Sequence, residues 1–289
     1  MIGLGVMGSA MAANLLRAGF RVFGYDIARG RRTRLSRSGG TSLQSASEVA
    51  RSASIIITSL PSADALFDVC SEIRKEKIKR QIVVETSTLP IPVKEAARRR
   101  LAEAGVTLLD CPLSGTGAQA RVKDLVVYAS GSGAAVRRSR TVFNGFSRKS
   151  FYLGKFGNGS RMKFAANLLV AIHNVSAAEA VILARKSGLN PALAVEVLGN
   201  GAGASRMLQV RGPMMARRSY RNATMSNDLW QKDMKIIGEF VRRLRSPAPL
   251  FHATKAIYRK TLQRGFGKAD TAAVCAVLEK RARSTSGRR

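Results

Sequence analysis

Residues 1–16 read MIGLGVMGSAMAANLL, and this stretch decides the fold that the sequence predicts. Its glycines are spaced Gly3-x-Gly5-x-x-Gly8, and an apolar stretch with helical periodicity follows at once. This spacing normally joins a β-strand to a helix whose amino terminus receives the pyrophosphate of a dinucleotide. Because only Met1 and Ile2 precede Gly3, we expect a dinucleotide-binding loop with a truncated first strand.

The shortened strand is central in a sheet of this topology, so its neighbours would expose main-chain hydrogen-bonding groups. We therefore expect either that the natural start lies a few residues upstream or that the chain is a degraded copy. In both cases the cofactor domain, as the sequence stands, would be less stable.

The first half of the chain alternates apolar runs with helical stretches. The helical stretches include residues 8–18, residues 91–104 and one that begins at Ser45, with Glu48 completing a capping box. Strands buried on both faces are apolar along their whole length, as are residues 21–26, 54–60, 81–87, 106–111 and 125–129. The alternation predicts an α/β fold with a Rossmann-type doubly wound, mostly parallel sheet.

The pattern changes near residue 154. A helix that is apolar almost all round is predicted over residues 157–187, and the rest reads as helices and loops without a convincing strand. We therefore expect a dinucleotide-binding Rossmann domain over residues 1–154 and an all-helical domain for substrate binding and dimerisation over residues 155–289. From about residue 281 we expect a disordered basic tail.

The composition is that of a globular protein with an unusual charge. Lys and Arg number 49 against 18 Asp and Glu, which gives a formal net charge of +31. We interpret this as an arginine-rich solvated surface. The alternative is a surface that holds nucleic acid or anionic membranes through counterion release. Aromatic residues make up 6% and do not alternate with the basic clusters, which disfavours binding of single-stranded nucleic acid.

The cysteines Cys70, Cys111 and Cys275 show neither metal-ligand spacing nor a disulfide framework. They indicate buried thiols, no metal site and a reducing compartment, so we expect a cytoplasmic protein. No apolar run reaches membrane-spanning length, and the start lacks the basic region of a signal peptide. We therefore expect no membrane partner.

An acidic residue follows the glycine loop at the spacing that dinucleotide sites require. Asp26 ends the second strand, roughly twenty residues beyond the glycines. Its carboxylate can accept hydrogen bonds from the ribose hydroxyls, which favours NAD. Arg29, Arg31 and Arg32 follow closely and could accommodate a 2′-phosphate, so NADP stays open.

Four motifs together resemble the 3-hydroxyisobutyrate dehydrogenase family of β-hydroxyacid dehydrogenases. Residues 2–8, continuing through Met11 to Asn14, resemble its amino-terminal signature. Residues 110–115, DCPLSG, resemble its substrate-binding segment, and residues 157–163, GNGSRMK, with Asn167 resemble its catalytic helix. Lys232-Asp233-Met234 resembles a late motif near the nicotinamide. The motifs stand in the family's order and span nearly the whole chain.

The resemblance implies an oxidoreductase that transfers a hydride between NAD(P) and a small 3-hydroxy carboxylate, such as 3-hydroxyisobutyrate or a 2-hydroxy-3-oxo acid. Lys163 is the implied general acid and base, and Asn167, one helical turn further, would position the lysine or the substrate. The implied substrate-binding residues are Ser114, Gly115 and Thr116. The implied cofactor contacts are Gly3, Leu4, Gly5, Val6, Met7, Gly8, Asp26, Leu60, Pro61, Thr88 and Lys232. A homodimer or homotetramer is also implied.

The sequence departs from the family pattern at two positions. Thr116 stands where the second glycine of a Ser-Gly-Gly segment is usual, and Ala166 stands where the first of two adjacent asparagines is usual. We expect Thr116 to add bulk beside the carboxylate site and to restrict the backbone there. An alternative function is a catalytically weak family member that binds nucleic acid through its basic surface, but the presence of Lys163 favours the enzyme.

Overall fold

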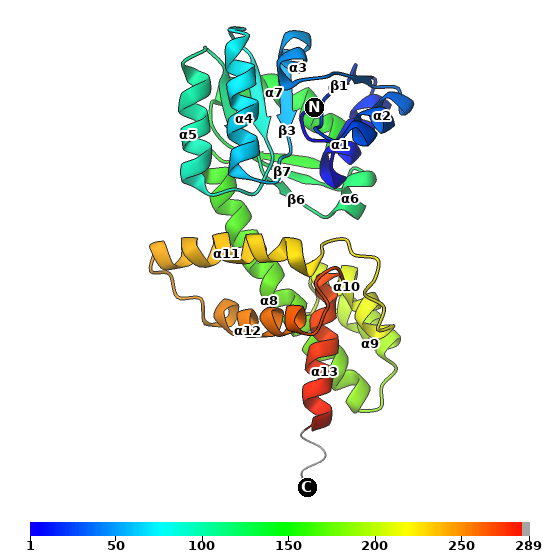
Figure 1. Ribbon diagram of the computed structural model, residues 1–289. Coiled ribbons are helices and arrows are strands. Elements are labelled where there is room, and N and C mark those ends of the chain that lie inside the picture. Colours follow the sequence, from blue (N-terminus) through cyan, green and yellow to red (C-terminus); the bar gives the residue numbers. More distant parts are fainter. Residues whose placement is uncertain (285–289) are drawn as a thin grey trace. The chain divides into compact units, whose positions relative to one another are not determined.

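The structure, a computed structural model, describes residues 1–284 and, up to residue 280, their side chains. Its contacts divide the chain into a first unit, Met1–Lys163, and a helical unit from Phe164 onward (Figure 1). The division falls inside one helix, α8 (Asn158–Lys186), because the first turn of this helix is bonded to strand ends of the first unit. The boundary expected from the sequence, between residues 154 and 155, lies just before α8.

Parallel strands form the sheet of the first unit. β1 pairs with β2, and β3, β4 and β5 pair in that order, with all these pairs parallel. A smaller group follows, in which β7 pairs antiparallel with β6 and parallel with β8. The strands are β1 (Phe23–Gly24), β2 (Thr41–Ser42), β3 (Ile55–Thr58), β4 (Ile82–Glu85), β5 (Thr107–Asp110), β6 (Leu113–Ser114), β7 (Val126–Ala129) and β8 (Lys149–Tyr152).

The first residues of the chain fill the centre of this sheet. Ile2 makes parallel bridges to Tyr25 on one side and to Thr58 on the other, so it joins β1 to β3. Its amide donates to the carbonyl of Ile57 at 2.8 Å, and its carbonyl accepts from the amide of Ser59 at 3.0 Å. The shortened first strand therefore occupies the central position that the sequence predicts for it.

Helices cover both faces of the sheet. Because successive strand residues point to opposite faces, neighbouring residues of one strand pack with different helices. Val83 and Leu108 pack with the helices α3, α4 and α5, whereas Val84 and Leu109 pack with α1, α6 and α7. This arrangement confirms the predicted α/β fold with a doubly wound sheet. The helices are α1 (Val6–Arg17), α2 (Arg29–Arg37), α3 (Ala46–Ser52), α4 (Ala63–Lys75), α5 (Ile91–Ala102), α6 (Gly117–Arg121) and α7 (Gly133–Phe146).

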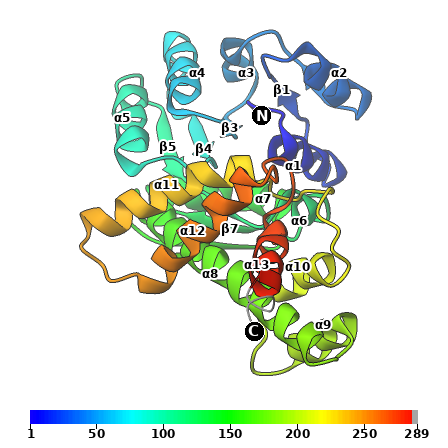
Figure 2. The same cartoon turned by 60° about the horizontal axis from the view of Figure 1, so that its bottom comes forward.

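The rest of the described chain contains helices and no strand after β8, as the sequence predicts (Figure 2). The helices that follow α8 are α9 (Pro191–Asn200), α10 (Arg206–Ala216), α11 (Asn227–Arg243), α12 (Pro249–Gln263) and α13 (Val274–Ser284), with a 3₁₀ turn at Thr271–Ala273. The helix α13 reaches into the segment expected to be a disordered tail, and residues 285–289 of that segment lie outside the described residues.

The expectation that no apolar run reaches membrane-spanning length is wrong for the long helix α8. Within residues 1–284 it is the one helix that could cross a membrane by length and composition. Its apolar character has another origin, because Phe164, Ala171, Ala178 and Val181 are buried in the core of the helical unit. A central helix of a globular domain has this composition.

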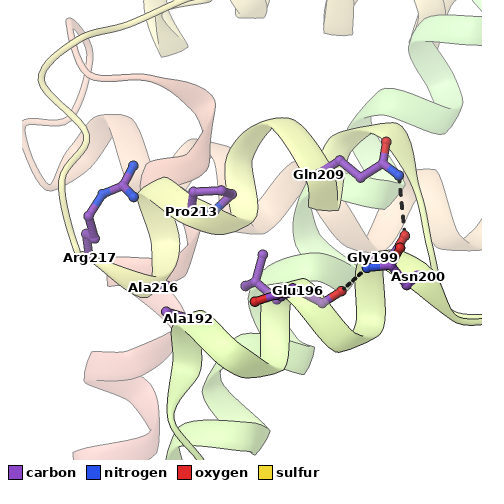
Figure 3. Close-up of a pocket in the computed structure, with 9 residues that line it drawn as sticks. Ala192, Glu196, Gly199, Asn200, Gln209, Pro213, Ala216 and Arg217 are labelled. Atoms are coloured by element: carbon purple, nitrogen blue, oxygen red, sulfur yellow. Dashed lines mark hydrogen bonds between the residues drawn. The ribbon is translucent and has the colours of Figure 1, made fainter.

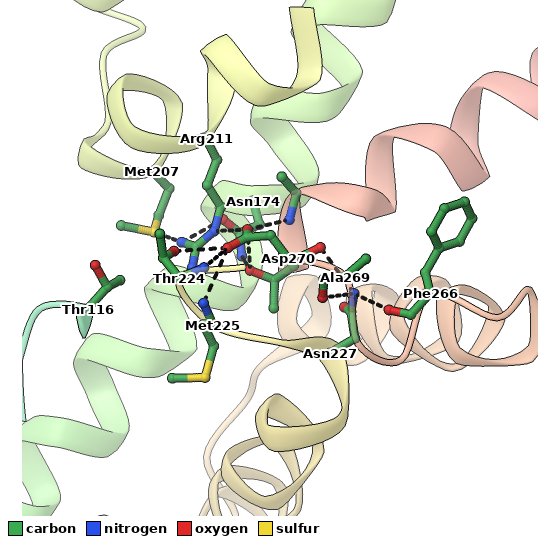
Figure 4. A network of polar contacts seen from close by, with 12 residues as sticks. Thr116, Asn174, Met207, Arg211, Thr224, Met225, Asn227, Phe266, Ala269 and Asp270 are labelled. Atoms are coloured by element: carbon green, nitrogen blue, oxygen red, sulfur yellow. Dashed lines mark hydrogen bonds and ion pairs between the residues drawn. The ribbon is translucent and has the colours of Figure 1, made fainter. Parts of the chain in front are cut away.

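A buried ion pair joins the helices of the helical unit (Figure 4). Arg211, which is 2% exposed, donates from Nε to Asp270 Oδ1 at 2.9 Å and from a terminal nitrogen to Asn174 Oδ1 at 3.3 Å. Asp270 Oδ2 accepts from the Thr224 amide at 2.8 Å. Burial acts to raise the pKa of Asp270, but Arg211, the Ala272 amide and Thr224 outweigh it and hold the pKa below its ordinary value.

Replacing Asp270 with Asn should lower the free energy of unfolding by about 3 kcal/mol at pH 7, because Arg211 would stay buried without a counter-charge. Since folding lowers the pKa of Asp270, the stabilisation is present above the ordinary value of 3.8 and is lost as the pH falls further. Urea denaturation at successive pH values from 7 to 3 measures the gap between wild type and variant, which should narrow below pH 4. An equal gap at every pH would contradict the ionic origin. Glu239→Gln, which alters an exposed carboxylate on α11, is the matched control.

Candidate active site

The predicted site residues of the first unit follow the carboxyl ends of neighbouring strands. Residues 3–8 follow Ile2, Asp26 follows β1, Leu60 follows β3, and Thr88 follows β4. The substrate segment, residues 114–116, follows β5 by way of β6. Because the strands are parallel, these ends lie on one edge of the sheet, which is where open α/β sheets bind ligands.

The three glycines of the loop have different surroundings. A Cβ on Gly3, whose φ is +86°, would lie 2.2 Å from the Ser59 carbonyl oxygen, and one on Gly8 would lie 1.9 Å from the Gly3 carbonyl oxygen. A Cβ on Gly5 would meet nothing within 4 Å. Gly3 and Gly8 are therefore required by the protein's own packing, whereas Gly5 faces open space.

The open side of the loop suits a dinucleotide. The helix α1 begins at Val6 with Gly5 as its N-cap, and within the described chain no side chain caps it and no acidic residue lies in its first turn. Such a helix start presents free amides and a partial positive charge to phosphate. Val6 is exposed and Met7 is half-buried, whereas the Leu4 side chain is buried in the core and its amide and carbonyl are bonded to Asp26 and Ser9.

Asp26 closes the loop from the next strand. Its Oδ2 accepts from the Leu4 amide at 2.7 Å and its Oδ1 accepts from the Ala28 amide at 2.8 Å, while Arg31 lies 3.2 Å from Oδ2. Burial acts to raise the pKa of Asp26, but these two amides and Arg31 lower it below its ordinary value. The carboxylate is therefore ionised at neutral pH and is fixed against the glycine loop.

The turns after β3 and β4 are tied to each other. The Leu60 amide donates to Ser87 Oγ at 2.8 Å, and the Thr86 hydroxyl donates to the Thr58 carbonyl at 2.7 Å. Pro61 is exposed and Thr88 is half-buried. These bonds fix the backbone on which the predicted cofactor contacts Leu60, Pro61 and Thr88 stand.

The substrate segment folds into a turn that requires one glycine, not two. Gly115 has φ +132°, a region that favours glycine, and a Cβ there would lie 2.6 Å from a Leu125 methyl group. Thr116 has an extended backbone, φ −99° and ψ 174°, which any residue adopts. Its amide donates to Gln119 Oε1 at 3.0 Å as α6 begins. Threonine is therefore compatible with the backbone observed at this position.

A buried cluster that the sequence analysis missed lies behind these turns. The Lys94 ammonium, on α5, is 2.6 Å from Glu85 Oε2 and 2.8 Å from Asp110 Oδ1, and all three residues are fully buried. Burial acts to lower the pKa of Lys94, but Asp110 and Glu85 outweigh it and raise the pKa above its ordinary value. The cluster therefore holds one ammonium between two carboxylates at the ends of β4 and β5.

The first turn of α8, the helix that carries Lys163, is hydrogen-bonded to this cluster. The Ser160 amide donates to Asp110 Oδ2 and the Ser160 hydroxyl donates to Asp110 Oδ1, each at 2.8 Å. The Gly159 amide donates to Ser130 Oγ at 3.0 Å, and a Cβ on Gly159 would lie 2.6 Å from the Asp110 carbonyl oxygen. Lys163 is half-buried, one turn beyond Ser160, and is the last residue of the first unit.

In the helical unit, the predicted site residue Asn167 binds Asp233, a partner that the sequence did not predict for it. The Asn167 side chain, 5% exposed, donates from Nδ2 to Asp233 Oδ2 at 2.8 Å. Asp233 is 6% exposed and lies on α11. Lys232 is exposed, with Nζ 4.0 Å from Asp233 Oδ1. The side-chain orientation of Asn167 is therefore fixed by a bond across two helices.

A pocket elsewhere in the helical unit contains none of these residues. It measures about 410 Å³ and opens between α9 and α10 (Figure 3). Its lining includes Glu196, Gln209, Pro213 and Arg217. Within the part of the chain that the structure describes, no group of three or more His, Cys, Asp or Glu residues is arranged to hold a metal ion.

Two family models together match nearly the whole chain. The NAD binding domain of 6-phosphogluconate dehydrogenase matches residues 1–154. The NAD-binding region of NADP-dependent 3-hydroxyisobutyrate dehydrogenase matches residues 157–278. These matches, with the glycine loop and its open approach, define an NAD(P)-dependent dehydrogenase built from a Rossmann-type region and a helical region.

Individual relatives narrow this class. An L-threonate dehydrogenase of Cupriavidus necator is 30% identical, over 96% of this chain and 95% of its own. A crystal structure of 3-hydroxyisobutyrate dehydrogenase from Salmonella typhimurium has a TM-score of 0.86 at 26% identity and covers 96% and 98% of the two chains. A structure of the Mycobacterium tuberculosis 3-hydroxyisobutyrate dehydrogenase with L-serine has a TM-score of 0.85 at 26% identity and covers 96% and 97%. The chain belongs to the 3-hydroxyisobutyrate dehydrogenase family of NAD(P)-dependent hydroxyacid dehydrogenases.

The surroundings of Gly5 and Gly8 predict that replacing the first with alanine affects cofactor binding, whereas replacing the second affects stability. Gly5→Ala should change the free energy of unfolding by less than about 1 kcal/mol, because its Cβ enters open space at a helix N-cap. It should nevertheless weaken NADH binding about tenfold or more, because the methyl group would lie where the phosphates approach. Gly8→Ala should instead lower the melting temperature markedly, since its Cβ collides with the Gly3 carbonyl. Thermal melts and NADH fluorescence titrations measure both effects, and unchanged NADH affinity in folded Gly5→Ala would contradict this assignment of the loop.

Proposed function

We propose that the protein transfers a hydride between NAD(P) and a small 3-hydroxy carboxylate, or the corresponding semialdehyde, with Lys163 as the general acid and base. The observation that carries this proposal is that Asp110 connects the proposed substrate turn with the helix of Lys163. The strand end at Asp110 leads into the Ser114–Gly115 turn, and the same carboxylate holds the first turn of the helix that carries Lys163. The proposed substrate and proton-transfer groups are thus supported by one residue.

NAD(P), when bound, supplies the nicotinamide carbon that accepts or gives the hydride. Residues 3–8 and the start of α1 would hold its pyrophosphate, and Asp26 its ribose hydroxyls. Leu60, Pro61 and Thr88 stand on the adjoining turns and would contact the rest of the cofactor. Lys232, which is exposed on α11, is a further proposed cofactor contact.

In oxidation the neutral Lys163 amine would take the proton of the substrate hydroxyl as the hydride leaves, and in reduction the ammonium would return it. The Ser114 hydroxyl and the backbone amide of Gly115 would hold the substrate carboxylate. Asn167, oriented by its bond to Asp233, would accept a hydrogen bond from Lys163 or from the substrate.

The names of the relatives support a small hydroxy carboxylate as the substrate. They include an L-threonate dehydrogenase, and 3-hydroxyisobutyrate dehydrogenase structures of which one was determined with L-serine. The same matches support the enzyme and not the alternative function of nucleic-acid binding. The threonine at position 116, buried beside the turn, would reduce the room around the carboxylate compared with glycine.

We also propose that the enzyme is a cytoplasmic homo-oligomer. The three cysteines are free and buried, and burial raises the pKa of Cys70 to about 12, which keeps this thiol protonated. Such thiols are typical of a reducing compartment. Leu183, Leu193 and Val197 are each more than half exposed on α8 and α9, and large exposed apolar side chains close in sequence are typical of a subunit interface.

Lys163→Ala should reduce kcat by a factor of 10² to 10⁴, the usual contribution of a positioned acid and base. NADH affinity and the melting temperature should stay near those of the wild type, because the side chain is only half-buried. Cofactor absorbance with a panel of 3-hydroxy acids measures the rate. Arg161→Ala removes an exposed positive charge two positions away and should retain activity. Equal activity of Lys163→Ala and wild type would exclude the proposed role.

Cofactor choice should depend on the charge of Asp26. We expect the wild type to bind NADH at least about tenfold more tightly than NADPH, because a 2′-phosphate beside this carboxylate is repelled. Asp26→Asn keeps an oxygen acceptor but removes the charge, so the two affinities should approach each other. Nicotinamide fluorescence titrations measure both. Tighter binding of NADPH by the wild type would reverse the assignment and implicate the neighbouring Arg31, 3.2 Å from the carboxylate.

A further inference from the structure

The Asp110 carboxylate is the acceptor for four donors from three other elements. Lys94 Nζ on α5 and the Ser160 hydroxyl on α8 reach Oδ1, each at 2.8 Å. The Ser160 amide reaches Oδ2 at 2.8 Å, and the Ser130 hydroxyl, after β7, reaches it at 3.2 Å. Asp110, Ser130 and Lys94 are fully buried and Ser160 is 1% exposed, so water does not compete for these bonds.

The same cluster reaches the turns assigned to the cofactor. Glu85, the second carboxylate on Lys94, accepts the Ser87 amide at 2.9 Å through its other oxygen. Ser87 in turn accepts the Leu60 amide. A chain of hydrogen bonds and ion pairs therefore runs from the turns that carry Leu60 and Thr88, through Lys94, to the first turn of α8, and it is buried and charge-assisted from the Ser87 amide onward.

This arrangement is more than a means of stability. Glu85, Lys94 and Asp110 place charged groups where no water reaches them, and apolar residues of similar volume often stabilise a fold as well or better. The Asp110 carboxylate lies at the amino terminus of α8, where the helix has its partial positive end and unpaired amides. It is therefore placed to fix the start of this helix.

We propose that Asp110, braced by Lys94 and Glu85, is a positioning residue that sets the place of Lys163 through Ser160; the proposal rests on the function proposed above. Lys163 follows Ser160 by three residues, which is one helical turn. A carboxylate bound to both the amide and the hydroxyl of Ser160 fixes the height and the rotation of that turn. Because proton transfer tolerates little misplacement, a shift of about 1 Å at Lys163 would slow turnover by about 100-fold.

The test compares Ser160→Ala with Ser139→Ala. Each replaces a fully buried serine of the first unit, but within the described residues the Ser139 hydroxyl has no hydrogen-bond partner. For Ser160→Ala we expect kcat to fall about tenfold while the KM for the cofactor stays unchanged. We also expect a shift of the limb of the pH–rate profile that Lys163→Ala abolishes, because a displaced amine would lie in different surroundings. Ser139→Ala should match the wild type in all three readouts.

Hydrogen exchange adds a readout that does not depend on turnover. The amides of residues 160–163 should exchange faster in Ser160→Ala than in Ser139→Ala, while those of β4 and β5 stay protected. If Ser160→Ala fails to fold, Ser130→Ala, which removes the hydroxyl between Gly159 and Asp110, should give smaller changes in the same directions.

The outcomes separate this proposal from the proposed function. A wild type without turnover on any 3-hydroxy acid, or an unimpaired Lys163→Ala, would overturn the proposed function and the positioning role with it. An active wild type that Lys163→Ala inactivates, together with wild-type kcat and pH profile in folded Ser160→Ala, would overturn the positioning role alone. A lower melting temperature without any change in kcat or pH profile would likewise overturn it and leave a structural tie.

Discussion

The Lys94 ammonium, held between Glu85 and Asp110, is the interaction on which the first unit depends. It joins α5 to the carboxyl ends of β4 and β5, and Asp110 extends the connection to α8. Without the lysine, two carboxylates would remain buried side by side, and breaking a buried ion pair by removing one partner typically costs 3–5 kcal/mol. The ends of the two strands are thus tied to each other and to α5.

The fold could be predicted because its strongest signals are local. Gly3 and Gly8 are dictated by contacts within the loop, and the buried strands are apolar along their length. Where the sequence pattern is weak, the structure contains helices and strands that the sequence does not predict. The strand β8 is largely exposed, β2 has only two residues, and α2, RGRRTRLSR, shows no apolar periodicity. These elements are fixed by pairing and by packing of single residues such as Leu35.

The site was predicted only where residues carry a motif. Lys163, Asn167 and Ser114 stand in recognisable segments, whereas Lys94 gave no signal because a lysine on an amphipathic helix is ordinarily solvated. Its partners, Glu85 and Asp110, lie on two strands and are brought to it only by the parallel pairing of β4 with β5. The bond from Asn167 to Asp233 likewise joins residues far apart in sequence. Such contacts follow from the fold and not from local pattern.

The excess of basic residues extends to positions with an unfavourable backbone conformation. Each described non-glycine residue with positive φ is basic: Lys77, Arg80, Lys123, Arg218 and Arg245. Four of them directly follow the residue that caps a helix, a position where glycine avoids a cost of about 1 kcal/mol. Basic residues therefore occur even where the backbone disfavours any side chain, which agrees with a general compositional bias better than with a surface selected for one polyanion.

The continuity of α8 has a consequence for recombining this protein with its relatives. Lys163 ends the first unit and Asn167 belongs to the helical unit, yet both stand on one unbroken helix. A chimera joined in the loop before Asn158 would import both residues with the foreign helix, but would set a foreign first turn on the native Asp110. A junction at the division itself would keep the native first turn with Lys163 and would import foreign counterparts of both Asn167 and Asp233. The two cut points therefore differ in the origin of Lys163, which is foreign with the first and native with the second, while Asn167 is foreign with both.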